Sequence, residues 1–319
     1  MDELVRQGLV FRKQGRGTFV TRQGGVRKIG LIIPDHGCSE FFPPIVKEIS
    51  HLAQETDYSL LFGEIADGAA QRRIWQVEKL AQDFIRQRVS GVICQPIDYV
   101  KDSEAVNRRV LAQFDAARIP VVLCDYDYVD APNRSPYDVV GVNNIDAGGM
   151  MVNHLRAVGA KRICFHLKPH APKSHQDYIR GAMYANGDRK DDTRRLLVSD
   201  PDDVDALRPF LKRARPDAIV CGNDSSAARL KKALWKLGVG VPQDVLLTGV
   251  NDLQIASLLT PTLTTIHLDC KQIAATAFER LLARIANPSL PPTELLLPVQ
   301  LVVRGSTSVG EGRRKAGGK

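Results

Sequence analysis

Polar or aromatic side chains follow nearly every short apolar run in this 319-residue sequence. Carboxylates and amides pair with hydroxyl groups, and aromatic faces cover the apolar C–H face of a sugar ring. This mixture of side chains suits a neutral, polyhydroxylated ligand and requires no bond-breaking chemistry. The residues that we select on this ground as ligand contacts are Phe41, Phe42, Gln95, Asp125, Tyr126, Asn223 and Asn251.

The same residue types also have a structural use. Asp and Asn after a strand commonly cap the next helix or form the turn that leads into it. For any single residue in the set, a capping role and a ligand contact both stay open. The recurrence of such residues at so many strand ends favours a ligand for the set as a whole.

The elements that position these residues follow an alternating pattern from Lys28 onward, because short β-branched runs alternate with helical stretches. In the first half, the pattern predicts strands at 28–34, 58–63, 91–96 and 119–127, and helices at 44–56, 72–88 and 103–117. After a polar segment at 128–136, it predicts strands at 137–143, 161–167, 194–199, 217–224 and 244–252. The helices predicted there span 146–159, 174–186, 202–214 and 226–238.

Two such halves predict an α/β protein with two lobes, each a parallel sheet flanked by helices. The strand at 263–269, the helix at 271–286 and the strand at 295–306 are expected to return to the first lobe and finish the fold. We place lobe 1 at about 28–128 and 268–290, and lobe 2 at about 137–262 and 295–305. Ligands of open parallel sheets bind outside the carboxyl ends of the strands, so the cleft between the lobes is the expected site. Several chain crossings would form a hinge there.

Positive charge is concentrated at the two ends of the chain, whose formal net charge is +8. Residues 1–28 hold seven basic and two acidic residues, a net charge of +5, and residues 305–319 hold four and one, a net charge of +3. The 276 residues between them are therefore neutral overall. This distribution indicates a polyanion at the ends and an uncharged partner in the middle. The tail at 308–319 is Gly- and Lys/Arg-rich, which predicts disorder.

Several classes of protein are disfavoured by what the sequence lacks. It has no apolar stretch of membrane-spanning length and no signal peptide at MDELVRQGL, so we expect a cytoplasmic protein that does not enter a membrane. The six cysteines are scattered without a CxxC pair, which predicts free thiols and no metal site. No nucleophile elbow, HExxH or Walker motif is present. We therefore expect neither an enzyme nor a bound cofactor.

An extended series of motifs resembles the effector domain of the LacI/GalR regulators over residues 28–307. The series comprises PDAIVCGNDSSAARLKKALWKLGVGVPQDVLLTGVNDLQIASLLTPTLTTI and, after a helix, LVVRGST. The resemblance implies effector contacts at Asn223 and Asn251, and a first-lobe wall formed by Phe41, Phe42, Asp125 and Tyr126. It also implies the two-lobed fold of periplasmic binding proteins and a homodimer.

Two positions depart from the pattern of that family. The family usually has Asp where this chain has Asn251, and it usually has an Arg where this chain has Tyr178. That Arg grips ligand hydroxyls. We include Tyr178 among the candidate effector contacts, where it would stack on a sugar or serve only in packing.

The segment LVRQGLVFRKQGRGTFVTR at 4–22 resembles the end of a GntR-type winged-helix domain, in which a recognition helix leads into a two-stranded wing. The combination resembles the arabinose-repressor type of architecture, with a wing at 1–22 and a linker at 23–27. The DNA contacts implied by the resemblance are Arg12, Lys13, Arg16, Gly17 and Thr18. The helix that reads bases in such domains would lie upstream of these residues. Either the start codon is misplaced or sequence-specific DNA binding has been lost.

The sequence thus predicts a sugar-responsive transcriptional regulator with a small sugar or polyol as effector and DNA as partner. A sugar-binding module of the periplasmic type, without sequence-specific DNA binding, is the main alternative, because it shares the two-lobed fold. An enzyme is a third alternative.

Overall fold

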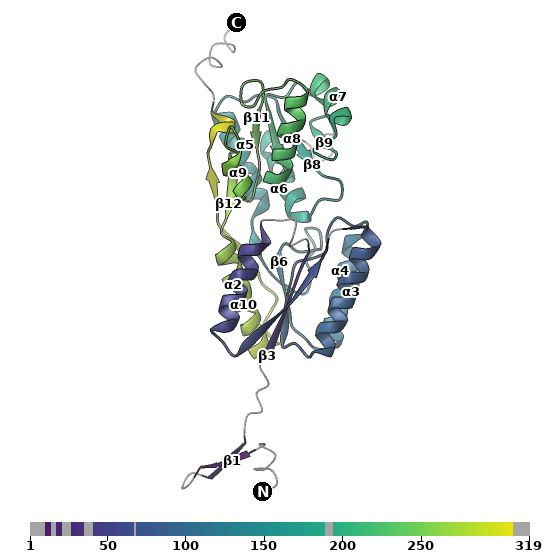
Figure 1. Ribbon diagram of the computed structural model, residues 1–319, viewed down its shortest axis with the longest axis vertical. Helices are drawn as coiled ribbons and strands as arrows, with labels where there is room; N and C mark the ends of the chain where they lie inside the picture. Colours follow the sequence, from purple (N-terminus) through teal and green to yellow (C-terminus); the bar gives the residue numbers. More distant parts are fainter. Residues whose placement is uncertain are drawn as a thin grey trace.

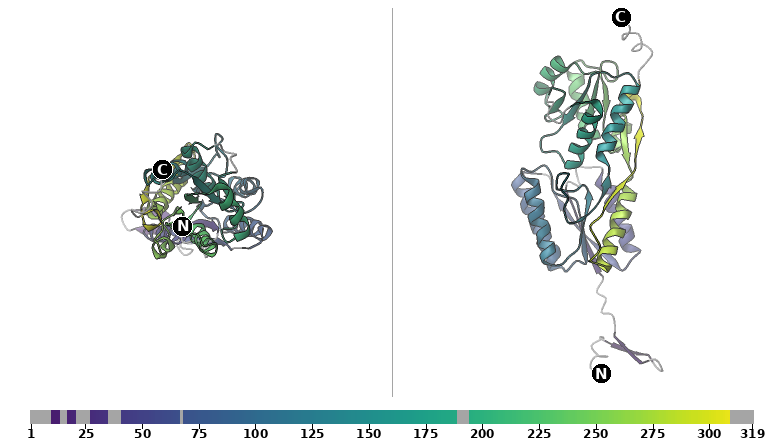
Figure 2. Two further views of the ribbon diagram at one scale, coloured as in Figure 1. Left: turned by 90° about the horizontal axis from the view of Figure 1, so that it is seen from above. Right: turned by 180° about the vertical axis from the view of Figure 1, so that it is seen from behind.

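The computed structural model describes residues 10–13, 17–20, 27–34, 41–66, 68–188 and 194–308. The described residues between 27 and 308 form two α/β lobes stacked along the long axis, which Figure 1 and the rear view in Figure 2 both show. The alternation of strands and helices predicted from the sequence is confirmed along both lobes. Among the described residues, no helix has the length and apolar character needed to span a membrane.

Lobe 1 is built on a six-stranded parallel sheet with the strand order β13-β7-β6-β5-β3-β4. Its central strands β5 (Gly91–Cys94) and β6 (Val121–Asp125) are buried along their whole length, as expected for strands covered on both faces. Next to them lie β3 (Arg27–Pro34) and β7 (Asp138–Val142), and the two edge strands are β4 (Tyr58–Ile65) and β13 (Glu294–Leu297).

Two pairs of helices cover the faces of this sheet (Figure 1). Helices α2 (Phe42–Gln54) and α10 (Cys270–Ala286) pack on one face against Ile29, Leu31 and Ile33 of β3. Helices α3 (Ala70–Arg86) and α4 (Ser103–Ala116) pack on the other face, where Ile32 points. The alternation of β3 between the two cores follows from the two-residue period of a strand.

The predicted boundary between the lobes at residue 137 is wrong. Strand β7 pairs in parallel with β6, with Leu123 opposite Val139, and β13 adds to the other side of β7. Both strands therefore belong to lobe 1, and the chain first leaves that lobe after β7. An apolar run such as DVVGV can be buried in either sheet, so its composition does not reveal which sheet it joins. The strand predicted at 295–306 is also divided, because Pro298 lacks the N–H needed to continue a ladder.

Lobe 2 is built on a parallel sheet with the order β11-β10-β8-β9. Helices α5 (Asn144–Ala157) and α6 (Lys173–Asn186) cover one face, and α7 (Val204–Ala214) and α8 (Asp224–Lys236) cover the other. The strands are β8 (Ile163–Leu167), β9 (Leu196–Val198), β10 (Ala218–Cys221) and β11 (Leu246–Thr248). A short helix, α9 (Gln254–Leu258), follows β11 and was not predicted.

An antiparallel pair, β12 (Thr265–Leu268) and β14 (Val299–Val302), lies beside the lobe 2 sheet through single bridges to Thr248 and Asn251. A 3-10 turn, η1 (Gly305–Thr307), follows β14. The chain thus passes between the lobes three times, after β7, after β12 and between β13 and β14. The three connections agree with the predicted multiple crossings.

The predicted N-terminal hairpin is confirmed as a hairpin. Strand β1 (Val10–Lys13) pairs antiparallel with β2 (Gly17–Val20), with Val10 opposite Val20 and Lys13 opposite Gly17. Residues 14–16, between the two strands, and the predicted disordered tail beyond residue 308 lie outside the described residues.

Candidate functional site

A cavity of about 500 Å³ lies between the two lobes and receives side chains from both. Most of its lining follows the carboxyl ends of β5, β6, β8, β10 and β11 or begins the helices that come next. This is the position expected for a ligand site in parallel sheets. The lining residues are Phe41, Phe42, Gly68, Arg73, Gln95, Asp98, Tyr99, Asp125, Asn144, Lys168, Pro172, Ser174, His175, Asn223, Ser225, Ser226, Arg229, Val250, Asn251, Leu253 and Leu268.

Six of the eight predicted effector contacts are brought together in this cavity, namely Phe41, Phe42, Gln95, Asp125, Asn223 and Asn251. The other two are not part of its lining. The Tyr126 hydroxyl donates to the Pro96 carbonyl at 3.0 Å, and the fully buried Tyr178 donates to the Gly249 carbonyl at 3.1 Å. Of the two uses left open for Tyr178, the geometry favours packing.

Asp125 joins the two lobes at the centre of the site. Its Oδ2 accepts hydrogen bonds from Ser174 Oγ of lobe 2 at 3.0 Å and from Gln95 Nε2 at 3.4 Å. Its backbone is left-handed, with φ of 81°, and the absence of a side chain at Gly141 on β7 leaves room for its carbonyl. Burial raises the pKa of Asp125 to about 7, although the bonds from Ser174 and Gln95 act in the opposite direction.

Gln95 presents an acceptor that the protein does not use. The side chain is 2% exposed, and its Oε1 has no hydrogen-bond partner among the described residues. A buried carbonyl oxygen of this kind costs free energy unless a ligand or water donates to it. Since Gln95 lines the cavity, a ligand hydroxyl is a suitable donor.

Phe41 and Phe42 form an aromatic wall at the start of α2. Their rings meet edge to face, with centroids 4.9 Å apart, and both side chains are buried. Aromatic surface of this kind can cover the C–H face of a sugar.

The second-lobe amides are fixed by the ends of their elements. The Asn223 side chain caps α8 by accepting from the Ser226 N–H at 2.7 Å, so the capping role weighed from the sequence is real. The cap uses only Oδ1, and the amide nitrogen makes no hydrogen bond among the described residues, which leaves its two N–H donors for a ligand. Asn251 has a φ of 103° and donates its backbone N–H to the Ile266 carbonyl.

Asp224, directly after Asn223, anchors the loop that carries Asn251. The fully buried carboxylate accepts from the Leu253 N–H at 2.8 Å and from Thr265 Oγ1 at 2.7 Å. Burial raises its pKa to about 7, against these two hydrogen bonds. A Cβ at Gly249 would lie 2.1 Å from its Oδ1, so only glycine fits there.

The LVVRGST motif closes the same region from the other side. Arg304 pairs with Asp252 at 2.6 Å, and Asp252 also contacts His267 Nδ1 at 3.1 Å. Ser306 Oγ donates to the Leu247 carbonyl at 2.6 Å and accepts from the Thr264 N–H. These residues hold the second-lobe wall in place and do not line the cavity.

Sequence reasoning missed several lining residues. Ser174 and Ser225 lie in the first turns of α6 and α8, Lys168 follows β8, and Arg73 lies on α3, where it forms a buried ion pair with Asp98 at 3.3 Å. Nothing in the spacing of Ser174 or Arg73 indicates a site, because both reach the cavity from helices. Lys168 could have been found, since it stands one residue beyond the end of β8.

No metal site is found in the part of the chain that the structure describes, because no three His, Cys, Asp or Glu side chains gather there. Cys94, Cys124, Cys164, Cys221 and Cys270 are free thiols, as predicted. Four of them are buried, and the fifth, Cys270, is partly exposed.

The predicted DNA contacts lie on the N-terminal hairpin. Arg12 and Lys13 belong to β1, and Gly17 and Thr18 to β2, with Arg12 opposite Thr18. Arg16 lies outside the described residues.

Tyr178→Phe is expected to leave sugar affinity unchanged within about twofold and to lower the free energy of unfolding by about 1–2 kcal/mol, because the buried Gly249 carbonyl loses its donor. Tyr184→Phe is the matched control, since Tyr184 lies on the same helix and is 52% exposed. Urea unfolding and calorimetric titration measure the two effects. A large loss of affinity with unchanged stability would restore Tyr178 to the ligand site.

Comparisons with known proteins agree with this architecture. Residues 152–307 match the family described as "Periplasmic binding protein-like domain". The chain is 27% identical over 326 residues to the arabinose metabolism transcriptional repressor of Geobacillus stearothermophilus, covering 96% of this chain and 85% of that protein. It is also 27% identical over 292 residues to the ribose operon repressor of Escherichia coli K12, covering 87% and 81% of the two chains.

Among solved structures, the complex of the transcriptional regulator CelR with cellobiose superposes with a TM-score of 0.74 at 21% identity, covering 88% of this chain and 84% of that one. The predicted fold is confirmed: the chain has the two-lobed, periplasmic-binding-protein-like α/β fold. Its homologues in sequence include transcriptional repressors.

Proposed function

We propose that this chain is a transcriptional regulator of the LacI/GalR type, in which a small sugar or related polyol binds between the lobes and alters DNA binding. The observation that carries the proposal is the cavity itself, where two carboxylates, four amides and an aromatic pair converge from both lobes. Alignment of 96% of the chain with an arabinose repressor supports a regulatory role over a catalytic one.

The cavity offers complementary groups for a polyol. The Asp125 carboxylate and Gln95 Oε1 accept hydrogen bonds from hydroxyls, while the amide nitrogens of Asn223 and Asn251 donate to hydroxyl oxygens. The Phe41 and Phe42 rings supply apolar surface. Recognition therefore needs no cofactor and no reacting group.

Closure of the lobes is the proposed response to the ligand. Two bonds already join the lobes at the cavity, from Ser174 Oγ to Asp125 and from the Tyr99 N–H to the His170 carbonyl at 3.2 Å. A ligand that contacts both walls favours the closed arrangement by its differential affinity, and the three crossings act as the hinge. The N-terminal segment joins lobe 1 at β3, so a change in lobe arrangement changes the orientation of this segment relative to lobe 2.

The basic hairpin is the proposed DNA contact. Arg12, Lys13 and Arg16 would bind phosphates, with Gly17 and Thr18 allowing close approach, as in the wing of a GntR-type winged helix. A cytoplasmic location follows from this role.

A homodimer is the proposed assembly, since two-fold operators are read by two-fold proteins. Trp235 on α8 and Leu258 on α9 are 76% and 68% exposed, and Lys231 of α8 donates to the Thr260 carbonyl beside α9. The two apolar side chains thus belong to one surface that a partner subunit would bury. Sedimentation velocity at micromolar concentration tests this, and a monomer would contradict it.

The experiment that tests the function combines a sugar titration with a DNA titration. Purified chain is titrated with D-ribose, L-arabinose, D-glucose and cellobiose by calorimetry, and then with a labelled fragment from upstream of its own gene, with and without the binding sugar. We expect one sugar to bind and to change DNA affinity at fixed salt. Sugar binding without any DNA binding would support the bare binding module instead, and failure of every sugar tested would contradict the proposal.

A further inference from the structure

The charges that line the cavity are unevenly shared between its walls. Among the residues that the structure describes, Arg73, Lys168 and Arg229 line it, together with the carboxylates of Asp98 and Asp125. Arg73 is already paired with Asp98, so that charge is matched inside lobe 1. The other two cations both belong to lobe 2, where Arg229 also has carboxylate partners, Asp200 and Asp202, but these lie outside the cavity.

Lys168 is a cation that lies over an aromatic ring. It forms no ion pair with a carboxylate of the described residues, and its Nζ lies 5.0 Å from the centre of the Tyr99 ring. An ammonium group carries three donors and is strongly hydrated, so an aromatic face satisfies it only in part. Its donors are available to an acceptor in the cavity.

Arg229 and Lys168 both act electrostatically on His166, but the carboxylates that bind Arg229 lie outside the cavity. Burial lowers the pKa of His166 to about 4, and the positive charges of Arg229 and Lys168 act on that imidazole in the same direction. Asp200 and Asp202 bind the guanidinium at 2.8 and 2.6 Å, yet both are about half exposed and neither lines the cavity. They orient Arg229 and do not fill the site.

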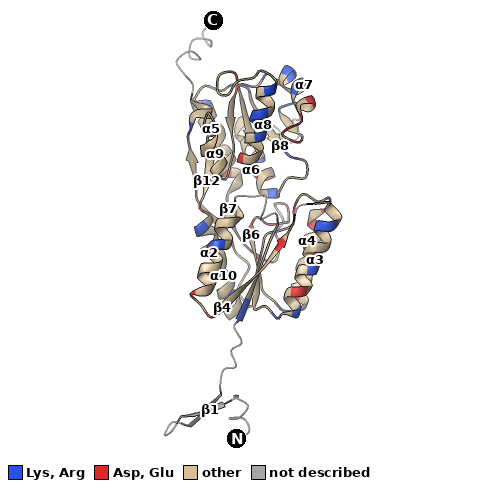
Figure 3. Ribbon diagram, in the orientation of Figure 1, with Lys and Arg blue, Asp and Glu red and all other residues tan. Residues whose placement is uncertain are grey.

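The first turn of α8 adds neutral donors between these cations. Ser225 lines the cavity four residues before Arg229, so the two lie on one face of the helix. The neighbouring N–H groups are used, because Asp224 donates to the Val250 carbonyl and Ser226 to the Asn223 side chain. The N–H and hydroxyl of Ser225 have no hydrogen-bond partner in the described part of the chain. Figure 3 shows the basic residues distributed along α8.

The opposite wall shows independently that this cavity is shaped for an occupant. Gln95 Oε1 is buried and unpartnered at the lobe 1 side, where it can accept only from a donor in the cavity. A ligand that spans the site therefore meets groups that accept hydrogen bonds from its hydroxyls at lobe 1. At lobe 2 it meets the hydrogen-bond donors of Lys168, Ser225 and Arg229. This polarity does not suit a ligand with hydroxyls alone.

We infer that the effector carries a compact oxyanion, a phosphate or a carboxylate, which binds Lys168, Ser225 and Arg229 at the N-terminus of α8, while its hydroxyls bind lobe 1. This inference rests on the proposed function and narrows its ligand class from sugars to anionic sugar derivatives. Helix N-termini bind such anions through free N–H groups and the helix dipole, and charge-assisted bonds strengthen the contact.

Matched pairs of charged and neutral sugars test the inference. Calorimetric titration of the whole chain compares D-ribose with D-ribose 5-phosphate, and D-glucose with D-glucose 6-phosphate and D-gluconate. We expect a charged member to bind at least about tenfold more tightly than its neutral counterpart in 50 mM NaCl, with a smaller ratio in 500 mM NaCl. A preference for the phosphates over D-gluconate identifies a phosphate, and the reverse identifies a carboxylate.

Variants locate the anion. Lys168→Met and Ser225→Ala are each expected to bring the charged-to-neutral affinity ratio about tenfold closer to one. Lys232→Met is the matched control, because Lys232 is an exposed residue of α8 outside the cavity, and its ratio should not change. Thermal unfolding confirms that each variant is folded.

The outcomes separate the two proposals. If neutral sugars bind as tightly as charged ones, or if Lys168→Met leaves the ratio unchanged, the anion subsite is wrong while the sugar-binding function stands. If neither charged nor neutral sugars bind, the proposed function itself fails and the inference fails with it.

Discussion

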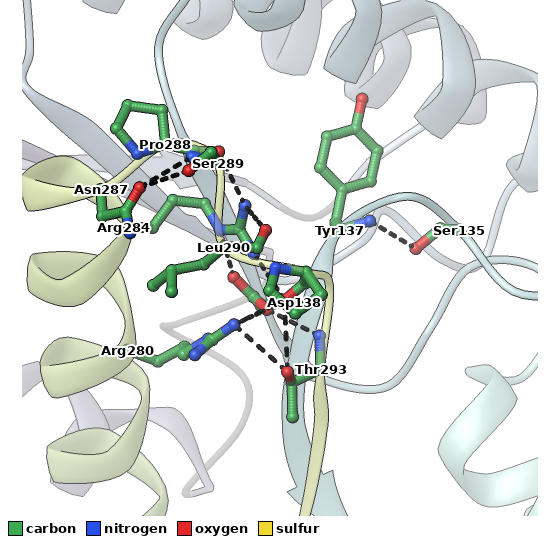
Figure 4. Close-up of polar contacts among 11 residues, drawn as sticks. Ser135, Tyr137, Asp138, Arg280, Arg284, Asn287, Pro288, Ser289, Leu290 and Thr293 are labelled. Carbon is green, nitrogen blue, oxygen red and sulfur yellow. Dashed lines mark hydrogen bonds and ion pairs between the residues drawn. The ribbon is translucent and has the colours of Figure 1, made fainter.

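Asp138→Ala is expected to lower the free energy of unfolding by about 3–5 kcal/mol, the largest effect of any single substitution discussed for this chain. Asp138 is the first residue of β7 and its side chain is fully buried. Its Oδ1 lies 2.9 Å from Arg280 Nη2, its Oδ2 accepts from Arg284 Nε at 2.5 Å, and the Thr293 N–H donates to Oδ1 at 2.8 Å (Figure 4). Alanine would leave two largely buried guanidinium groups without their counter-charge.

The cluster matters because it ties the returning chain to lobe 1. Arg280 and Arg284 lie on the last turns of α10, and Arg284 also donates to the Leu290 carbonyl, while Thr293 leads into β13 (Figure 4). One carboxylate therefore joins the start of β7 to the end of α10 and to the residue before β13, which lie more than 140 positions later in the sequence. Loss of this carboxylate should loosen the end of lobe 1 at which its parallel strands begin. Strand β3 also begins at that end.

Urea unfolding checks this prediction, with Asp57→Ala as the matched control. Asp57 is an exposed aspartate whose carboxylate lies 4.0 Å from Arg27, so its loss should change stability by less than about 0.5 kcal/mol.

Burial opposes ionisation of Asp138, but the bonds from Arg284, Arg280 and Thr293 outweigh it and lower the pKa below its ordinary value. A carboxylate whose pKa is lowered by folding stabilises the folded protein at pH values above its unfolded-state pKa, and this stabilisation is lost in acid. The stabilities of the wild type and Asp138→Ala should therefore converge as the pH falls below about 4. A difference below about 1 kcal/mol at pH 7 would contradict the structural role.

The same cluster illustrates what the sequence could not reveal. The apolar periodicity of DVVGV predicts a strand at 137–143, and the strand is present, but its partner depends on contacts with β6 and β13. Asp138 is the first residue of that strand, and nothing in the neighbouring sequence marks it as half of an ion pair. Its two arginine partners lie more than 140 positions later, and local patterns hold no information about such a pairing.

Part of the candidate site could be predicted from the sequence, and part could not. The rule that ligands meet the carboxyl ends of parallel strands selects Gln95, Asp125, Asn223 and Asn251, and all four line the cavity. Tyr178 was selected by its alignment with a family arginine, but its position on α6 turns the ring into the core. Ser174 and Ser225 went unnoticed because their contribution depends on how the two lobes approach each other.

Asp125→Asn is expected to reduce affinity for the effector about 10- to 100-fold at pH 8, since a hydrogen bond to a charged acceptor contributes about 1.5–3 kcal/mol. Asparagine keeps the shape and one acceptor oxygen, so the bond from Ser174 can persist and the fold should remain intact. Calorimetric titration between pH 6 and 8 measures the effect. Asp205→Asn, an exposed aspartate on α7, is the matched control.

The pH dependence gives a sharper test than the loss of affinity alone. Burial raises the pKa of Asp125 to about 7, so the carboxylate that accepts ligand hydroxyls forms as the pH rises from 6 to 8, and wild-type affinity should rise over that window. Stability should change in the opposite direction. A carboxyl group whose pKa is raised in the native state favours the folded protein while it is protonated, and that contribution is lost as the pH rises through 7.

The wild-type protein without ligand should therefore become less stable from pH 5 to pH 8 while binding its effector more tightly. Asp125→Asn removes one titrating group from both quantities, so its affinity should be nearly independent of pH and its stability curve flatter. Asp224, whose pKa burial also raises to about 7, stays in the variant and contributes the stability slope that remains. If Asp125→Asn kept the wild-type pH dependence of affinity, the acceptor of the ligand hydroxyls would have to be another group, and the central place of Asp125 in the cavity would be structural only.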